Sequence, residues 1–155
     1  MSVAIVLGSK SDLPVARAAT EVLKELGVAY SVHIASAHRT PGLLRELVEK
    51  SAAGVFIGIA GLSAALPGAI ASHTTKPVIG VPVSGKVNLD AILSIVQMPP
   101  GIPVAAVGLD SGANAAVLAA QILAVCDIGL AERLARRRRA MQEKILADAK
   151  ELGDV

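Results

Sequence analysis

Short segments rich in apolar residues alternate along this chain with longer segments in which apolar residues return every three or four positions. A short apolar run is typical of a strand buried on both faces, whereas the longer spacing is typical of an amphipathic helix. The runs predict strands at residues 3–7, 30–35, 55–60, 77–82 and 104–107. The helical spacing predicts helices at residues 13–26, 43–50, 68–72, 89–96, 113–125 and 128–152.

Residues with special backbone or capping preferences mark the ends of the first two helices. Ser11 or Asp12 is the expected N-cap of the first helix, and Gly27 is expected to close it in a left-handed conformation. Thr40 is the expected N-cap of the second helix, with Pro41 at its first position. Each of these helices is therefore separated from the preceding strand by a short loop.

Strands that alternate with helices predict a parallel sheet with right-handed crossovers. Five such strands predict an α/β fold, a three-layer α/β/α sandwich around a flavodoxin-like five-stranded parallel sheet. A chain of 155 residues is long enough to bury one core, so we expect a single catalytic domain over residues 1–155. The long C-terminal helix at 128–152 exceeds what the sheet needs, and we expect it to pack on a neighbouring subunit.

Composition adds an expectation of self-association. Apolar residues make up 53% of the chain and the mean hydropathy is +0.59. No window reaches about 18 uninterrupted apolar residues, so we expect no membrane span. Burial of strands on both faces explains part of the apolar surplus. Extensive subunit interfaces would explain the rest, which favours a homo-oligomer.

The lone cysteine and the start of the chain indicate a cytoplasmic protein. A single Cys126 cannot form an internal disulfide, which fits a reducing compartment. We expect Cys126 to be a buried, small apolar residue within a helix. The chain begins directly with a predicted strand, so we expect no signal peptide.

Charge does not favour a nucleic-acid partner. The formal net charge is +2, and four consecutive arginines at 136–139 hold much of the basic excess. With one Tyr and one Phe in the chain, aromatic platforms for stacking bases are scarce. We therefore interpret the arginines as the solvated side of the last helix and expect no nucleic-acid binding.

The loop at residues 8–12 (GSKSD) follows the first predicted strand. Gly8 allows a ligand to approach the backbone closely, and amides at the start of the next helix favour an anion. Ser9 offers a hydroxyl, and Asp12 can accept hydrogen bonds from vicinal ribose hydroxyls. The loop lacks the pattern of a Walker loop or of Gly-x-Gly-x-x-Gly. By itself it is equally compatible with a capped turn.

The segment at residues 36–41 (SAHRTP) is the more specific signal, because it lies where the second strand ends and a helix begins. Ligands of an open parallel sheet bind at that kind of junction. The imidazole of His38 is suited to general acid–base catalysis near neutral pH, and helix capping does not require it. The neighbouring Arg39 can bind phosphate or carboxylate. The pair indicates an enzyme that acts on a small phosphorylated metabolite.

The remaining candidates are weaker. Residues 60–68 hold small side chains and backbone amides at the same expected edge of the sheet. The proline-rich segment 97–103 is interpreted as a structural turn or a subunit contact. His33 and His73 are expected to be structural, and three scattered histidines with one cysteine predict no metal site. No Gly-x-Ser-x-Gly elbow is present.

Five segments occur in the order seen in one family: GSKSD at 8–12, SAHRTP at 36–41, LPG at 66–68, SIVQMP at 94–99 and NAA at 114–116. The chain resembles the catalytic subunit family of phosphoribosylaminoimidazole carboxylase, of de novo purine biosynthesis, over nearly its whole length. The resemblance implies a flavodoxin-like subunit in an octamer, no metal or organic cofactor, and a ribonucleotide substrate together with carbon dioxide. Its product would be 4-carboxy-5-aminoimidazole ribonucleotide.

The resemblance also implies residue roles. His38 matches the catalytic position and would serve as the proton shuttle. Ser9, Asp12 and Arg39 match positions that hold the ribonucleotide, and Ser36 is a weaker candidate for the same role.

Two activities are open within the family. Members of the bacterial type are mutases that move the carboxylate of 5-(carboxyamino)imidazole ribonucleotide from nitrogen to a ring carbon, whereas members of the animal type carboxylate aminoimidazole ribonucleotide directly. The first type usually has histidine where this chain has Ala65, and the second has lysine where this chain has Arg39. We favour the mutase and keep direct carboxylation as the alternative. A carboxylase for another nucleotide and a non-catalytic ribonucleotide-binding module are more remote.

Overall fold

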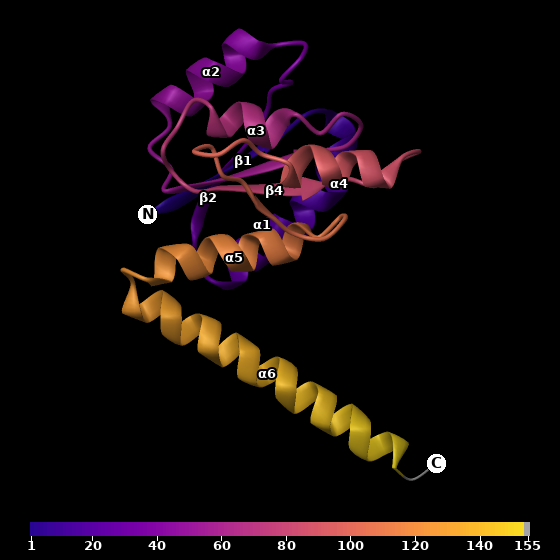
Figure 1. The fold of residues 1–155 in the computed structure, drawn as a ribbon. Coiled ribbons are helices and arrows are strands. Elements are labelled where there is room, and N and C mark those ends of the chain that lie inside the picture. The colour runs from indigo at the N-terminus through magenta and orange to yellow at the C-terminus, as the bar shows by residue number, and fades with distance from the viewer. Residues whose placement is uncertain (154–155) are drawn as a thin grey trace.

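The computed structural model describes residues 1–153, which form a parallel sheet with helices on both faces (Figure 1). The order of its strands is β2-β1-β3-β4-β5, and all neighbours are parallel. This is the flavodoxin-like order, so the predicted fold class is confirmed. The strands are β1 (Ser2–Leu7), β2 (Ala29–Ile34), β3 (Val55–Ala60), β4 (Val78–Pro82) and β5 (Ala105–Ala106).

The helices follow the predicted pattern, with small shifts at their ends. They are the short 3₁₀ helix η1 (Lys10–Asp12), α1 (Leu13–Glu25), α2 (Pro41–Lys50), α3 (Leu66–Ala71), α4 (Asn88–Val96), α5 (Gly112–Ala124) and α6 (Ile128–Leu152). The helix α3 begins two residues earlier than expected, because Pro67 fits its first turn. Gly27 has the predicted left-handed conformation after α1, with φ of 63°.

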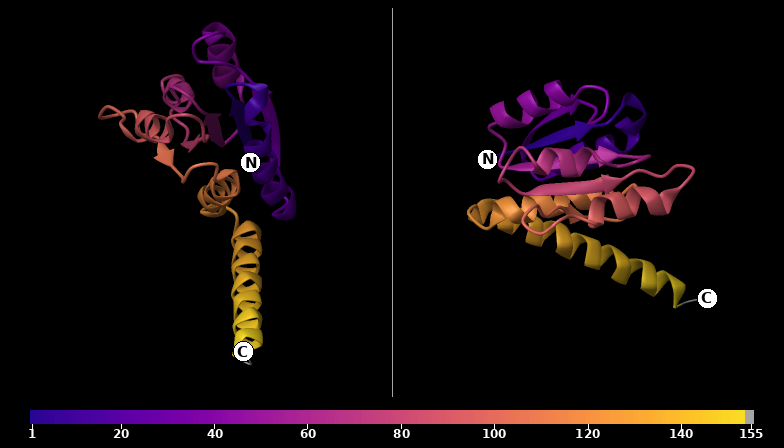
Figure 2. Two further views of the ribbon diagram at one scale, coloured as in Figure 1. Left: turned by 90° about the vertical axis from the view of Figure 1, so that its right-hand side faces the viewer. Right: turned by 45° about the horizontal axis from the view of Figure 1, so that its top comes forward.

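Side chains of the central strands point alternately to two separate cores. Val3, Ile5 and Leu7 of β1 pack with α1 and α5 on one face of the sheet. Ala4 and Val6 of the same strand pack with α2, α3 and α4 on the other face. All five of these residues are fully buried. Figures 1 and 2 show the resulting layers, with α2 and α5 on opposite sides of the sheet.

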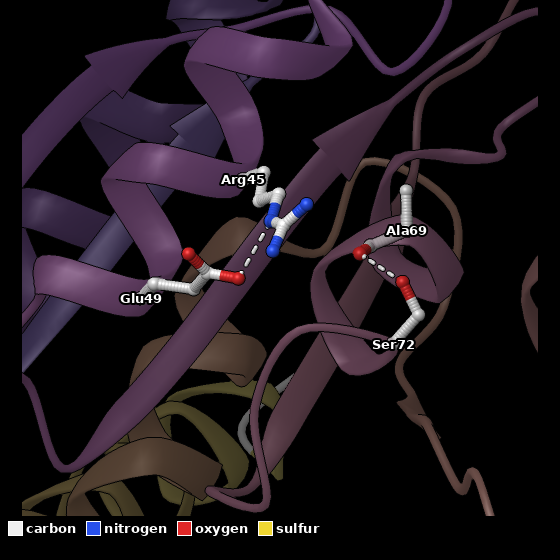
Figure 3. A network of polar contacts seen from close by, with 4 residues as sticks. All are labelled: Arg45, Glu49, Ala69 and Ser72. Carbon is white, nitrogen blue, oxygen red and sulfur yellow. Dashed lines mark hydrogen bonds and ion pairs between the residues drawn. The ribbon is translucent and has the colours of Figure 1, made fainter.

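The helices α2 and α3, which follow the loops after β2 and β3, are stabilised by local polar contacts (Figure 3). The Arg45 guanidinium pairs with the Glu49 carboxylate at 2.7 Å on the exposed side of α2. The Ser72 hydroxyl donates a hydrogen bond of 2.8 Å to the Ala69 carbonyl at the end of α3. An exposed pair spaced by four residues contributes only about 0.3–0.5 kcal/mol, so the apolar core is the main support of α2.

The last helix α6 is attached to the body of the protein at its start. The Asp127 carboxylate caps it by accepting the Leu130 N–H at 2.9 Å. Further along, Arg133 donates to the Leu26 carbonyl at 2.8 Å, and Arg137 pairs with Glu25 at 3.0 Å. Beyond these contacts α6 extends away from the sheet, which confirms the predicted long C-terminal helix (Figures 1 and 2). Its contact with another subunit stays a prediction.

The expectation that Cys126 is buried within a helix is wrong. Cys126 is exposed and lies in the turn between α5 and α6. The reason is that α5 ends at Ala124, so the cysteine falls beyond the face that packs on the sheet.

Within residues 1–153, no helix combines the length and the apolar character needed to span a bilayer.

Candidate active site

A cavity of about 490 Å³ lies at the carboxyl ends of β1, β2, β3 and β4. The loops that follow these four strands supply its walls, as expected for an open parallel sheet. All five residues singled out from the sequence line it: Ser9, Asp12, Ser36, His38 and Arg39. The cavity is in the size range of small-molecule sites.

The loop after β1, residues 8–12, is called the first loop and is held by reciprocal hydrogen bonds. The Ser9 hydroxyl accepts the Ser11 N–H at 3.1 Å, and Asp12 Oδ2 accepts the Ser9 N–H at 2.9 Å. Asp12 Oδ1 also accepts the Ser11 hydroxyl at 3.2 Å. Asp12 is only 7% exposed, and its carboxylate is the buried charged group of residues 1–153. These bonds fix the loop before any ligand binds.

The N-cap of α1 is Asp12, one of the two predicted residues, and an additional 3₁₀ turn precedes this helix. Ser9 caps the 3₁₀ turn η1, which the sequence did not reveal, through a capping box with Asp12. Asp12 does occupy the N-cap position of α1, but its side chain makes no capping hydrogen bond to that helix. Its carboxylate is instead turned back to the loop.

The loop after β2, residues 35–40, is the second loop, and it folds into a turn that carries His38 and Arg39. The Thr40 N–H donates to the Ser36 carbonyl at 3.0 Å, and the Ser36 N–H donates to the Thr40 hydroxyl at 2.9 Å. Thr40 is thus at the N-cap position of α2 as predicted, but its side chain closes the turn and does not cap the helix. His38, at the tip of the turn, is exposed and faces the cavity.

Arg39 is placed by contacts on both sides of its guanidinium. Its Nε and its backbone N–H both donate to the Ser36 hydroxyl, at 3.3 Å and 3.2 Å. Its Nη2 donates to the Gly8 carbonyl at 2.9 Å. Ser36 is therefore engaged in orienting Arg39. The guanidinium connects the first two loops and leaves further N–H groups for an anion.

The loops after β3 (residues 61–65, the third loop) and after β4 (residues 83–87, the fourth loop) complete the cavity. The third contributes Gly61, Leu62, Ala64 and Ala65, as the small residues at 60–68 predicted. The fourth contributes Val83 and Ser84, which sequence analysis missed. The available signal was the end of a predicted strand at Pro82, because a parallel strand ends at the same edge as its neighbours.

Other candidates lie outside the cavity. His33 is within β2 and bonds to the Ser31 hydroxyl at 2.8 Å, and His73 follows α3. Neither they nor residues 97–103 line the cavity. Within residues 1–153 no group of three or more His, Cys, Asp or Glu side chains could hold a metal ion.

Together the cavity brings a guanidinium, an imidazole, a carboxylate and hydroxyls to one edge of a flavodoxin-like sheet. This defines an α/β protein with a site suited to a small phosphorylated ligand and to proton transfer.

Comparison with known proteins agrees with this class. A family model described as AIR carboxylase matches residues 2–144. An N5-carboxyaminoimidazole ribonucleotide mutase from Methanocaldococcus jannaschii is 57% identical over 146 residues, which cover 94% of this chain and 93% of the relative. A mutase of the same name from Haemophilus influenzae is 47% identical, with 93% and 92% covered.

A solved structure supports the fold as well as the sequence match. The crystal structure of Treponema denticola PurE superposes with a TM-score of 0.85 at 32% identity, and 97% of each chain is covered. The chain belongs to the AIR carboxylase family.

Proposed function

We propose that this chain is an N5-carboxyaminoimidazole ribonucleotide mutase of de novo purine biosynthesis. The observation that carries the proposal is the 57% identity with a mutase of that name over almost the full length of both chains. The cavity supports it, because the residues that the reaction needs lie on adjacent loops of one site. The mutase interpretation is therefore favoured over direct carboxylation of aminoimidazole ribonucleotide.

The proposed reaction moves one carboxylate from nitrogen to carbon and includes two proton transfers. The bond between the exocyclic nitrogen and the carboxylate carbon breaks, which releases carbon dioxide within the cavity, and the nitrogen receives a proton. The electron-rich ring carbon then forms a bond to the trapped carbon dioxide and loses its own proton. These steps involve no net oxidation and use no metal or organic cofactor.

His38 is proposed as the residue that moves both protons. As an imidazolium it gives a proton to the departing nitrogen, and as an imidazole it takes one from the ring carbon. One residue can do both because the first transfer leaves it in the state that the second requires. Its exposed position at the tip of the second loop allows its ring to face a bound substrate.

The ribonucleotide is proposed to bind across the first two loops. Arg39 supplies guanidinium N–H groups for an anionic group, and Ser9 supplies a hydroxyl near the start of α1. Asp12 is proposed to accept hydrogen bonds from ribose hydroxyls. Ser36 acts chiefly through Arg39, which its hydroxyl orients.

The protein is proposed to act as a homo-oligomer, an octamer by resemblance to the family, with one catalytic domain over residues 1–155. An apolar groove of about 1140 Å³ between α5 and α6 supports a subunit contact. Exposed Met141, Ile145 and Leu146 lie along it. We also propose a cytoplasmic location. Light scattering on the purified protein would give the subunit number, and a monomer would contradict the proposed assembly.

The experiment that tests the activity offers two substrates separately. One is N5-carboxyaminoimidazole ribonucleotide without added bicarbonate, and the other is aminoimidazole ribonucleotide with carbon dioxide. Rates are compared with the spontaneous exchange between the two compounds. Faster product formation from the first supports the mutase, whereas faster formation from the second identifies a direct carboxylase. If neither substrate is converted but both ribonucleotides bind, the chain is a non-catalytic ribonucleotide-binding protein.

A further inference from the structure

The loop after β3 is held from outside the cavity by a side chain of α4. Gly61 and Leu62 line the cavity, whereas Ser63, in the same loop, does not. The Ser63 N–H instead donates a hydrogen bond of 3.0 Å to Asp90 Oδ2. Asp90 is in the first turn of α4 and is half-buried. One carboxylate therefore connects the cavity loop to a helix 27 residues later in the chain.

The backbone of this loop has a conformation that needs support. Ser63 has φ of 55°, in the left-handed region that favours glycine. The Ala64 N–H donates to the Gly61 carbonyl at 2.9 Å, which closes a tight turn around Ser63. A non-glycine residue persists in this region where its surroundings hold it. The bond to Asp90 supplies part of that hold.

The loop after β4 has a matching arrangement. Ser84 lines the cavity, and its N–H donates to Asp110 Oδ1 at 2.8 Å. Asp110 itself has φ of 55°, and its N–H donates to the Pro82 carbonyl at 2.8 Å. Ser63 and Asp110 are the non-glycine residues of positive φ within residues 1–153. Each takes part in one of the two bonds between a carboxylate and a loop amide: Ser63 donates its N–H to Asp90, and Asp110 accepts the N–H of Ser84.

Neither carboxylate is paired with a basic side chain within residues 1–153. The ion pairs within the described part of the chain join other residues and include neither Asp90 nor Asp110. Hydrogen bonds to an ionised acceptor are shorter and stronger than those between neutral groups.

We propose that Asp90 and Asp110 are positioning residues, which act on the reaction through the backbones of Ser63 and Ser84 and do not touch the substrate. The proposal rests on the mutase activity proposed above. The two loops that they hold border the same cavity as His38. Displacement of either loop would misalign the ring and the trapped carbon dioxide with the imidazole. The ribonucleotide contacts lie on the other two loops, so kcat should fall more than KM rises.

The test compares Asp90→Ala, Asp90→Asn and Asp110→Ala with the matched control Asp127→Ala. Asp127 also accepts one backbone N–H at a helix start, but it lies far along the chain from the cavity loops and does not line the cavity. We expect each of the two alanine variants at the proposed positions to lose about 10- to 100-fold in kcat, with KM little changed. Asp90→Asn keeps an oxygen acceptor but loses the charge, so it should restore part of the kcat. The control should keep the wild-type kcat.

Several outcomes would overturn the proposal. Equal kcat for Asp90→Ala and wild type would exclude Asp90 from the reaction. An equal loss of kcat in Asp90→Asn and Asp90→Ala would show that the acceptor oxygen is irrelevant. Hydrogen exchange at the Ser63 amide gives a readout that does not depend on turnover. Exchange should accelerate in Asp90→Ala but not in the Asp127→Ala control. If wild type lacks mutase activity, the proposed function fails, and unchanged Ser63 exchange would separately refute the role of Asp90.

Discussion

The Nη2 atom of Arg39 donates a hydrogen bond of 2.9 Å to the carbonyl of Gly8, 31 residues earlier in the chain. This bond joins the loop after β1 to the loop after β2, whose strands pair in parallel with Leu7 opposite Ile34. The two loops that are proposed to bind the ribonucleotide are thus linked by the side chain that is proposed to bind its anionic group.

Replacement of Arg39 should mainly weaken substrate binding. Arg39→Ala removes both the loop contact and the guanidinium, and we expect KM to rise by about tenfold or more, which corresponds to about 1.4 kcal/mol. Arg39→Lys keeps the charge but loses the planar set of donors, so it should recover only part of the affinity. Steady-state kinetics and direct ribonucleotide titration measure the effect. An unchanged affinity in Arg39→Ala would remove this residue from the binding site.

Replacement of His38 should have the opposite signature. His38→Asn removes the proton shuttle but little contact area, so kcat should fall by at least about 100-fold. Titration with the ribonucleotide should give nearly the wild-type affinity. His38 is exposed, so the variant should unfold at the wild-type temperature. Retention of most of the activity would exclude His38 from the mechanism.

Asp12 should affect stability and binding together. Its carboxylate accepts the Ser9 N–H and the Ser11 hydroxyl, so Asp12→Ala removes these two hydrogen bonds of the first loop. We expect a loss of about 0.5–2 kcal/mol in the free energy of unfolding, as for other capping residues, and a higher KM. Asp127→Ala removes a cap far from the cavity and serves as the control. An equal rise of KM in both variants would exclude a binding role for Asp12.

The sheet and the first two site loops could be predicted because their signals are local. Residues 55–60 are all apolar apart from Gly58, and β3 has the predicted bounds, Val55–Ala60. His38 and Arg39 lie directly after a strand, where parallel topology places them at the site edge. The predicted strand at 104–107 was too long, because β5 is an edge strand that pairs only through Ala105 and Ala106.

The features that sequence analysis missed depend on contacts between distant segments. The bond from Ser63 to Asp90 joins residues 27 positions apart, and the bond from Ser84 to Asp110 joins residues 26 apart. Neither Ser63 nor Asp90 belongs to a local capping motif that would reveal the bond. The exposure of Cys126 is a different case, because the predicted helices at 113–125 and 128–152 already leave this cysteine in the turn between them.

The close packing of α1 on α5 should be intolerant of added volume. A Cβ atom at Gly112 would overlap the Val15 carbonyl oxygen, which belongs to the backbone and cannot rotate away. Gly112→Ala should therefore lower the free energy of unfolding by roughly 1–3 kcal/mol. Gly42→Ala is the control, because nothing lies within 4 Å of its added Cβ. Denaturant unfolding measures both variants, and equal stability would show that α5 can shift without cost.

One cavity is proposed both to release carbon dioxide from the carbamate and to recapture it. The most direct test supplies N5-carboxyaminoimidazole ribonucleotide labelled with ¹³C in its carboxylate, in unlabelled bicarbonate with carbonic anhydrase present. Mass spectrometry of the product after a single turnover follows the labelled carbon. The product should keep the label, because the carbon dioxide stays trapped beside the ring. A product that carries the unlabelled carbon of the solution would contradict it.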